Sequence, residues 1–140
     1  MNKLRSLIPG ALSGAAVYLL GLLGGWDAML AVMFTAMGLD YAAGLLTALA
    51  HRSRKADNGA YSPAAAFAGL TRKLLMLAVV AVAVLVDRLL GTDGLCRSAA
   101  IGFYTANEGF SILNSAVRLG LPMPGVLTDA LEKLRQRGEG

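Results

Sequence analysis

Long apolar stretches separated by short polar segments make up most of the chain. Four stretches, residues 7–25, 28–50, 70–90 and 96–117, approach the roughly 20 helical residues that cross a bilayer. A soluble helical bundle needs a polar face on each surface helix, and residues 7–25 and 74–86 offer none. The pattern therefore predicts an all-α integral membrane protein with about four transmembrane helices.

Short turn sequences join the four predicted spans in two pairs. Only Trp26 and Asp27 separate the first two spans, and the segment 91–94, Gly-Thr-Asp-Gly, joins the last two. We therefore expect two helical hairpins, with Trp26 at a membrane interface.

The third span has a second possible start. Ser62 and Pro63 form a helix-start signal upstream of it. A continuous helix from there to Leu90 would be about 42 Å long, which exceeds the hydrocarbon thickness. Either its first turns protrude into the cytoplasm, or the helix tilts and draws Lys73 inward as a counter-ion for an intramembrane carboxylate.

The chain divides at its C-terminal end. Gly120, Pro122 and Pro124 end the fourth span, so residues 1–120 form the predicted transmembrane domain and residues 121–140 a cytoplasmic amphipathic helix and tail. The apolar face of this short helix consists of Leu127, Ala130, Leu131 and Leu134.

Composition and charge support a membrane location. Hydrophobic residues make up 56% of the chain and charged residues 16%, against about 25% charged in ordinary soluble domains. The net charge is +4, but the basic residues flank the apolar stretches, which is typical of membrane topology rather than of nucleic-acid binding. We therefore expect a multi-pass protein of the bacterial cytoplasmic membrane, with the basic segment 51–60 and both termini in the cytoplasm.

Catalytic and metal-binding patterns are missing from the sequence. Cys96 and His51 are each the only residue of their type, so a disulfide or a cluster of metal ligands cannot be built from them. Phosphate-binding glycine loops and nucleophile motifs do not occur. We expect no enzymatic activity, no cofactor and no metal.

Polar residues inside the predicted spans are the main candidates for function. Asp40 and Glu108 lie near the centres of their spans, where a lipid-exposed charge costs about 2.5 to 3.5 kcal/mol. Asp87 lies near the end of its span and is also consistent with a solvated or headgroup-level residue. The candidates for a pore or an oligomer interface are Asp40, Lys73, Asp87, Asn107, Glu108, Ser111 and Asn114.

The polar residues of the fourth span recur at three- and four-residue spacing and form one stripe, from Tyr104 to Arg118. Two interpretations remain open: a buried network between helices, or a surface that lines water after subunits assemble. In the first span, the small residues Gly10, Gly14, Gly21 and Gly25 predict a face for close helix packing, within or between subunits.

Several segments resemble the phage lysis and toxin-secretion holin family, which includes clostridial toxin-export holins. The segments are residues 39–48 around Asp40, residues 68–73, the late-span Asp87, and residues 107–114 (Asn-Glu-Gly-Phe-Ser-Ile-Leu-Asn) with Gly120 and Pro124. The Ala-rich segment 62–66 departs from the family, which commonly has Ser and Lys there.

The resemblance implies a small phage or prophage protein that oligomerises with itself in the bilayer and opens lesions. The lesions release an endolysin or a toxin, without a required direct contact. From the residues alone, an ion or solute channel or transporter subunit using the intramembrane carboxylates is the alternative, and a scaffold without transport is a third possibility.

Overall fold

In the computed structural model, residues 2–50 and 61–139 are described, and they form helices joined by short connections. The side chains of residues 2–6 and the predicted basic loop 51–60 lie outside the described part. The helices are α1 (Asn2–Leu22), α2 (Ala28–Leu49), α3 (Pro63–Leu90), α4 (Leu95–Arg118) and α5 (Gly125–Glu139). The predicted all-α class is confirmed over these residues.

Local capping groups set the helix boundaries. Asp27 precedes α2 and accepts a hydrogen bond from the backbone N–H of Leu30 at 2.9 Å. Ser62 caps α3, Pro63 occupies its first turn, and Gly91 ends it in the left-handed conformation, with φ of 66°. α3 is thus one continuous helix of 28 residues, the longer of the two forms considered from the sequence.

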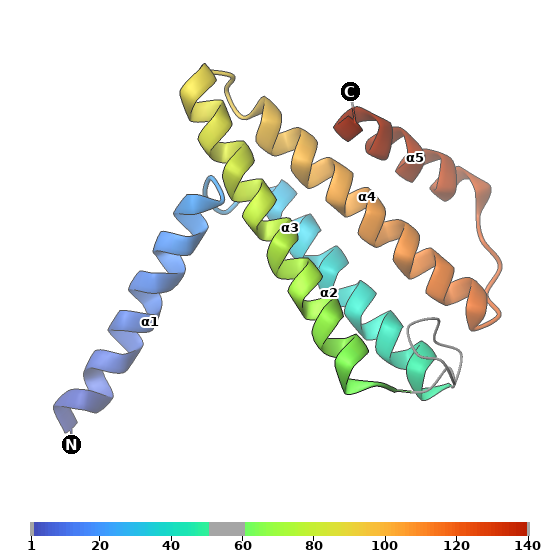
Figure 1. Ribbon diagram of the computed structural model, residues 1–140, viewed down its shortest axis with the longest axis horizontal. Helices are drawn as coiled ribbons and strands as arrows, with labels where there is room; N and C mark the ends of the chain where they lie inside the picture. Colours follow the sequence, from blue (N-terminus) through green and yellow to red (C-terminus); the bar gives the residue numbers. More distant parts are fainter. Residues whose placement is uncertain (1, 51–60, 140) are drawn as a thin grey trace.

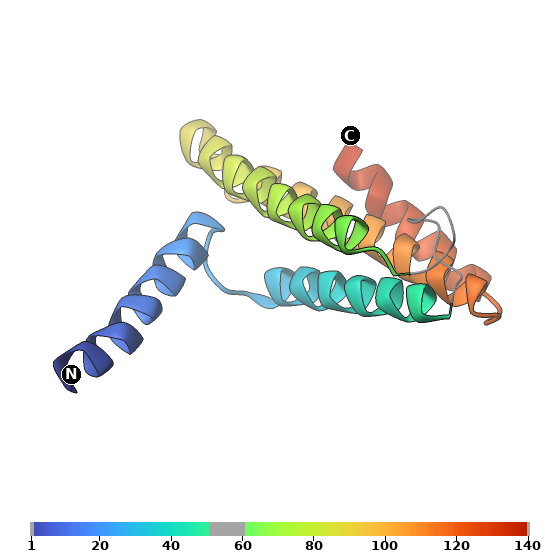
Figure 2. The same ribbon diagram turned by 60° about the horizontal axis from the view of Figure 1, so that its bottom comes forward.

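α4 is the central helix of the fold. It packs against α2, α3 and α5, whereas α1 projects away from the other helices (Figures 1 and 2). The tight hairpin predicted for the first two spans is therefore wrong. The turn after α1 explains this, because Gly24 and Gly25 take positive φ angles of 84° and 90° and redirect the chain.

The glycine face predicted in α1 is only partly present. Gly10, Gly14 and Gly21 lie on the helix and face open space, with no atom of another element within 4 Å of an added Cβ. Gly25 does not belong to this face, since α1 ends at Leu22. No described part of the chain covers these glycines.

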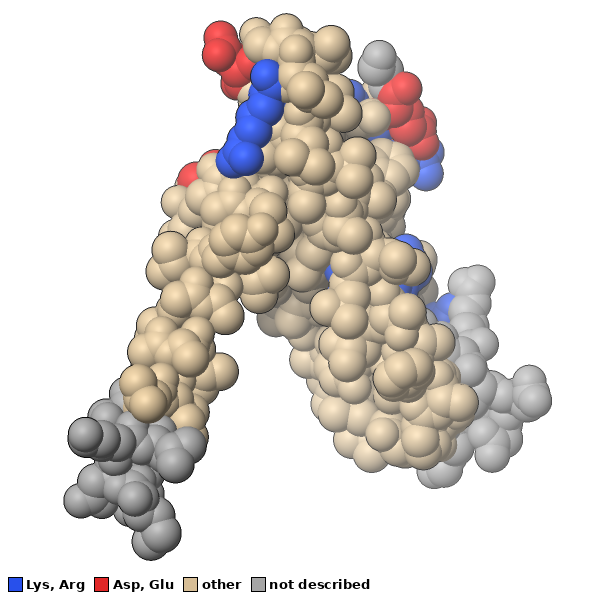
Figure 3. All heavy atoms as spheres, turned by 60° about the vertical axis from the view of Figure 1, so that its left-hand side comes forward, with Lys and Arg blue, Asp and Glu red and all other residues tan. Residues whose placement is uncertain are grey.

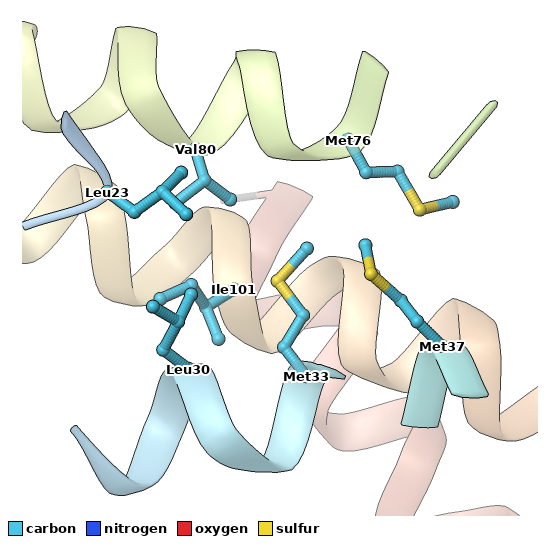
Figure 4. Close-up of a cluster of buried hydrophobic side chains, with 7 residues drawn as sticks. All are labelled: Leu23, Leu30, Met33, Met37, Met76, Val80 and Ile101. Carbon is cyan, nitrogen blue, oxygen red and sulfur yellow. The ribbon is translucent and has the colours of Figure 1, made fainter. Parts of the chain in front are cut away.

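A small apolar core joins the turn after α1 to the three helices α2, α3 and α4. Figure 4 shows its members converging between these helices. They are Leu23, Leu30, Met33, Met37, Met76, Val80 and Ile101. Many large apolar side chains on the outer faces of α1, α2 and α3 are exposed instead. In Figure 3 uncharged residues dominate the visible face.

Among the described helices, α2 is the one that is long and apolar enough, by length and composition, to cross a membrane. The apolar part of α1, Leu7–Leu22, is shorter. α5 packs along α4, with its C-terminal end beside the first turns of that helix (Figure 1). The predicted division of the chain at residue 120 stays a prediction.

Candidate functional site

Three charged side chains from three helices meet at mid-length in the bundle. Nζ of Lys73 on α3 lies 2.7 Å from Oδ2 of Asp40 on α2, and it also donates a hydrogen bond to Oε2 of Glu108 on α4. Asp40 is 6% exposed and Glu108 is 2% exposed. We call Asp40, Lys73 and Glu108 the ion triad.

The ammonium group of Lys73 connects α2, α3 and α4 through the ion triad. A buried carboxylate without a partner is strongly unfavourable, so the shared ammonium group offsets the desolvation of both acids. Lys73 is the counter-ion of both carboxylates, as one of the two alternatives for α3 predicts. The tilt of α3 that this alternative also includes stays a prediction. Separating the helices here breaks at least one of the two ion pairs of Lys73.

A pocket of about 50 Å³ reaches the ion triad from the end where α2 finishes and α3 begins. Asp40 and Lys73 form its inner end, and Tyr41, Tyr61 and Ser62 contribute polar groups to its wall. Most of the remaining wall is apolar, formed by Gly, Ala and Leu residues. A cavity of this size has room for water. The pocket therefore gives small molecules an approach to Asp40 and Lys73 from one side of the bundle.

The polar stripe of α4 crosses from the buried to the exposed side of that helix. Glu108 lies at its buried edge, Asn107 and Ser111 are half-buried, and Asn114 is exposed. At about 100° per residue, these positions spread over roughly a third of the helix circumference. One edge of the stripe belongs to the buried network and the other is open. That the open edge lines water after subunits assemble stays a prediction.

Asp87 caps the N-terminus of α4. Its Oδ1 accepts from the backbone N–H of Cys96 and its Oδ2 from that of Arg97, both at 2.8 Å, and the hydroxyl of Thr92 donates to Oδ1. The residue is only 7% exposed, so the solvated interpretation is wrong. A carboxylate at this position accepts hydrogen bonds from N–H groups that have no acceptor within the helix. These bonds also fix the α3–α4 turn.

Replacing Asp87 by alanine should destabilise the fold by about 1 to 3 kcal/mol, because at least two backbone donors lose their acceptor in a buried place. The Asp87→Asn variant keeps one acceptor oxygen and should lose less. Thermal unfolding in detergent, followed by circular dichroism, measures both. Equal melting temperatures for Asp87→Ala and the unmodified protein would contradict the capping role.

Arg97, in the first turn of α4, is the important residue that the sequence analysis missed. Its guanidinium donates to the carbonyl oxygens of Leu23 at 2.6 Å and Gly25 at 3.1 Å, and to both oxygens of Asp27, the shorter at 2.6 Å. It is 9% exposed. The available signal was its position: a basic residue at the predicted outer end of a span, opposite the positive-inside tendency.

The contact with Arg97 also changes the titration of Asp27. The hydrogen bond from the guanidinium, with that from the Leu30 N–H, lowers the pKa of Asp27 below its usual value. A lowered folded-state pKa contributes stability that is present above the ordinary aspartate pKa and is lost as the pH falls through the lowered one. The turn between α1 and α2 should therefore loosen only in acid.

Comparisons with known proteins point to one family. A model for the bacteriophage holin family matches residues 17–136. The chain is 33% identical over 115 residues to an uncharacterised protein of Clostridium perfringens, covering 81% of this chain and 80% of that protein.

Two further relatives extend the comparison. An uncharacterised protein of Listeria monocytogenes is 36% identical over 110 residues, covering 79% of this chain and 74% of its own length. A protein of Bacillus phage phi105 named "Probable holin" is 39% identical over 66 residues, covering 47% and 49%. No solved structure matches the chain.

Proposed function

Because this chain belongs to the bacteriophage holin family, we propose that it oligomerises in the cytoplasmic membrane and opens lesions that release an endolysin or a toxin. Family membership makes it a holin-type protein of the cytoplasmic membrane. The observation that carries the further step is the ion triad, together with the open polar edge of α4. A fold that exposes apolar faces on α1, α2 and α3 and keeps polar groups on α4 suits a bilayer with water on one side.

The topology that we propose has α1, α2, α3 and α4 crossing the membrane. The N-terminus and residues 51–60 lie in the cytoplasm, and the turns at Asp27 and Asp93 lie outside. In this orientation Asp40 is about 18 Å and Glu108 about 20 Å from the outer ends of their helices, near the middle of the bilayer. Lys73 is farther along α3 and reaches them with its long side chain.

In the proposed mechanism, the ion triad keeps α2, α3 and α4 together while protein accumulates. Self-association then brings the polar edges of α4 from several copies together. Above a critical density, an arrangement in which these edges face water becomes more favourable than one in which they stay shielded. The glycine face of α1, Gly10, Gly14 and Gly21, is open for contacts between copies.

Release of a folded enzyme from expressing cells tests this proposal. Induced expression should be followed by the appearance of a cytoplasmic enzyme in the medium, once a murein hydrolase is supplied. An unrelated multi-span protein at equal membrane abundance is the control. Permeability to ions with full retention of enzymes would instead support a channel subunit. This is the second candidate function, and the pocket that leads to the ion triad favours it. An intact membrane potential at high expression would contradict both.

A further inference from the structure

The packing of α5 on α4 uses a glycine from each helix. A Cβ added to Gly109 of α4 would lie 2.9 Å from Cδ2 of Leu131 on α5. A Cβ added to Gly138 of α5 would meet the Phe103 side chain and lie 3.0 Å from the carbonyl oxygen of Ala99 on α4. Each glycine thus accepts a side chain of the other helix. We call Ala99, Phe103, Gly109 and Phe110 of α4 the α5 seat.

A charged side chain of α5 is also fitted to this seat. The guanidinium carbon of Arg135 lies 5.8 Å from the centre of the Phe110 ring, and its NH2 group donates to Glu132 at 2.7 Å. A cation over an aromatic face contributes most when it is partly desolvated, as here. α5 therefore contacts α4 through a cation–aromatic pair as well as through apolar side chains.

The α5 seat lies at membrane depth in the proposed topology. It extends from Ala99 to Phe110, which includes the middle of the proposed span. The outer face of α5 carries Asp129, Lys133 and Arg137, all exposed. Each such charge facing lipid near the bilayer centre would cost about 2.5 to 3.5 kcal/mol. A seated α5 must therefore have water on its outer side.

The distribution of exposed apolar side chains shows the same sidedness. Large exposed hydrophobic residues extend along α2 and α3, for example Val32, Leu39, Leu74 and Val82. On α4, Leu95 and Val117 are exposed at the two ends, and no large hydrophobic residue between them, all described, is exposed. On α5, Val126, Leu127 and Leu134 are also exposed. The α2–α3 side is therefore the more apolar one, and the middle of α4 offers lipid no large exposed apolar side chain.

We propose that α5 stays on its seat in the membrane and that the outer face of α5, with the open edge of the α4 stripe, borders the water-filled interior of the lesion. This inference rests on the proposed function and deepens it, because it assigns the lining. α5 carries three acidic and three basic residues. Such a lining has no single sign of charge and therefore does not select between cations and anions.

A seated α5 does not lie in the cytoplasm, where the sequence predicts residues 121–140. The linker 119–124 still begins there. A seated α5 instead returns along α4, so that Gly138 lies beside Ala99, toward the outer end of the span. The length of α5, 15 residues or about 22 Å, carries the chain most of the way back across the bilayer.

A disulfide between α4 and α5 tests the seat. In a Cys96→Ser background, Gly109→Cys and Leu131→Cys place two thiols in reach, because a Cβ at position 109 would lie 3.6 Å from Cγ of Leu131. We expect this pair to cross-link in native membranes. The control pair Gly109→Cys and Ala130→Cys, with residue 130 exposed, should not. Failure of the first pair to cross-link would overturn the proposal.

The same cross-link tests whether α5 remains seated in the open lesion. The locked protein should release the reporter enzyme without loss relative to its reduced form. Loss of release that a reductant restores would mean that α5 must leave its seat, and would overturn the proposal.

Fluorescence quenching decides the environment of α5 independently of leakage. Single cysteines at Lys133 on α5 and at Val79, exposed on α3 at a similar depth, each carry a fluorophore in reconstituted vesicles. Aqueous iodide should quench the label at 133, and acyl-chain nitroxides the label at 79. Nitroxide quenching at 133 would overturn the water-facing assignment. If iodide quenches the label at 133 and the nitroxides quench the label at 79, but no enzyme is released, only the proposed function is contradicted.

Discussion

Replacing Lys73 by methionine should destabilise the folded protein by about 3 to 5 kcal/mol and abolish lesion formation. The change removes the ammonium group that contacts both buried carboxylates and leaves Asp40 and Glu108 close together with like charge. Both acids are held between the helices, at 6% and 2% exposed. Thermal unfolding in detergent, followed by the helical circular dichroism signal, measures the loss, and enzyme release measures the activity.

Two controls separate charge balance from side-chain packing. Arg72 is adjacent in sequence and exposed, so Arg72→Met should change stability by less than about 0.5 kcal/mol. Combining Lys73→Met with Asp40→Asn and Glu108→Gln removes all three charges and should recover much of the lost stability. If the single and triple variants unfold at the same temperature, the ion triad does not exist in the membrane protein.

The helices themselves were predictable because strong local signals agree. Long apolar stretches give α2 and α4 nearly their observed bounds, and Ser62, Pro63 and Gly91 mark both ends of α3. The carboxylates of the site were also found, since a charge in the centre of an apolar stretch stands out against its surroundings. The role of Lys73 as a counter-ion was only one of two alternatives, because the sequence does not determine how far a long helix protrudes from the membrane.

Contacts between distant segments were harder to predict. α1 diverges from α2 because two successive residues, Gly24 and Gly25, take positive φ angles, and hydrophobic pattern carries no information about that geometry. The fit of α5 on α4 depends on Gly109 and Gly138, each unremarkable until the partner side chain is known. Arg97 lies at the edge of its span, where a charge has no evident cost, so its partners could not be inferred.

Replacing Arg97 by methionine should release the turn between α1 and α2 and destabilise the protein by about 2 to 4 kcal/mol. Most of this loss should come from the carbonyl oxygens of Leu23 and Gly25, which lose a charged donor. The ion pair with Asp27 should contribute less, because the Asp27 side chain is 45% exposed and water screens it. Arg97→Lys should recover only part, since one ammonium group cannot reach all these acceptors at once.

Trp26, the only tryptophan in the chain, lies directly in this turn and reports on it. In Arg97→Met the Trp26 fluorescence anisotropy should fall, because the residue gains motion when the turn is released. Arg88→Met is the matched control: Arg88 is exposed and makes one hydrogen bond to the Gly21 carbonyl, at 3.2 Å. It should change stability by less than about 1 kcal/mol and leave the anisotropy unchanged. Leu20 of α1 packs against the apolar core, and Leu23 of the following turn belongs to it. An equal response of both variants would therefore mean that apolar packing, and not Arg97, holds α1 to the other helices.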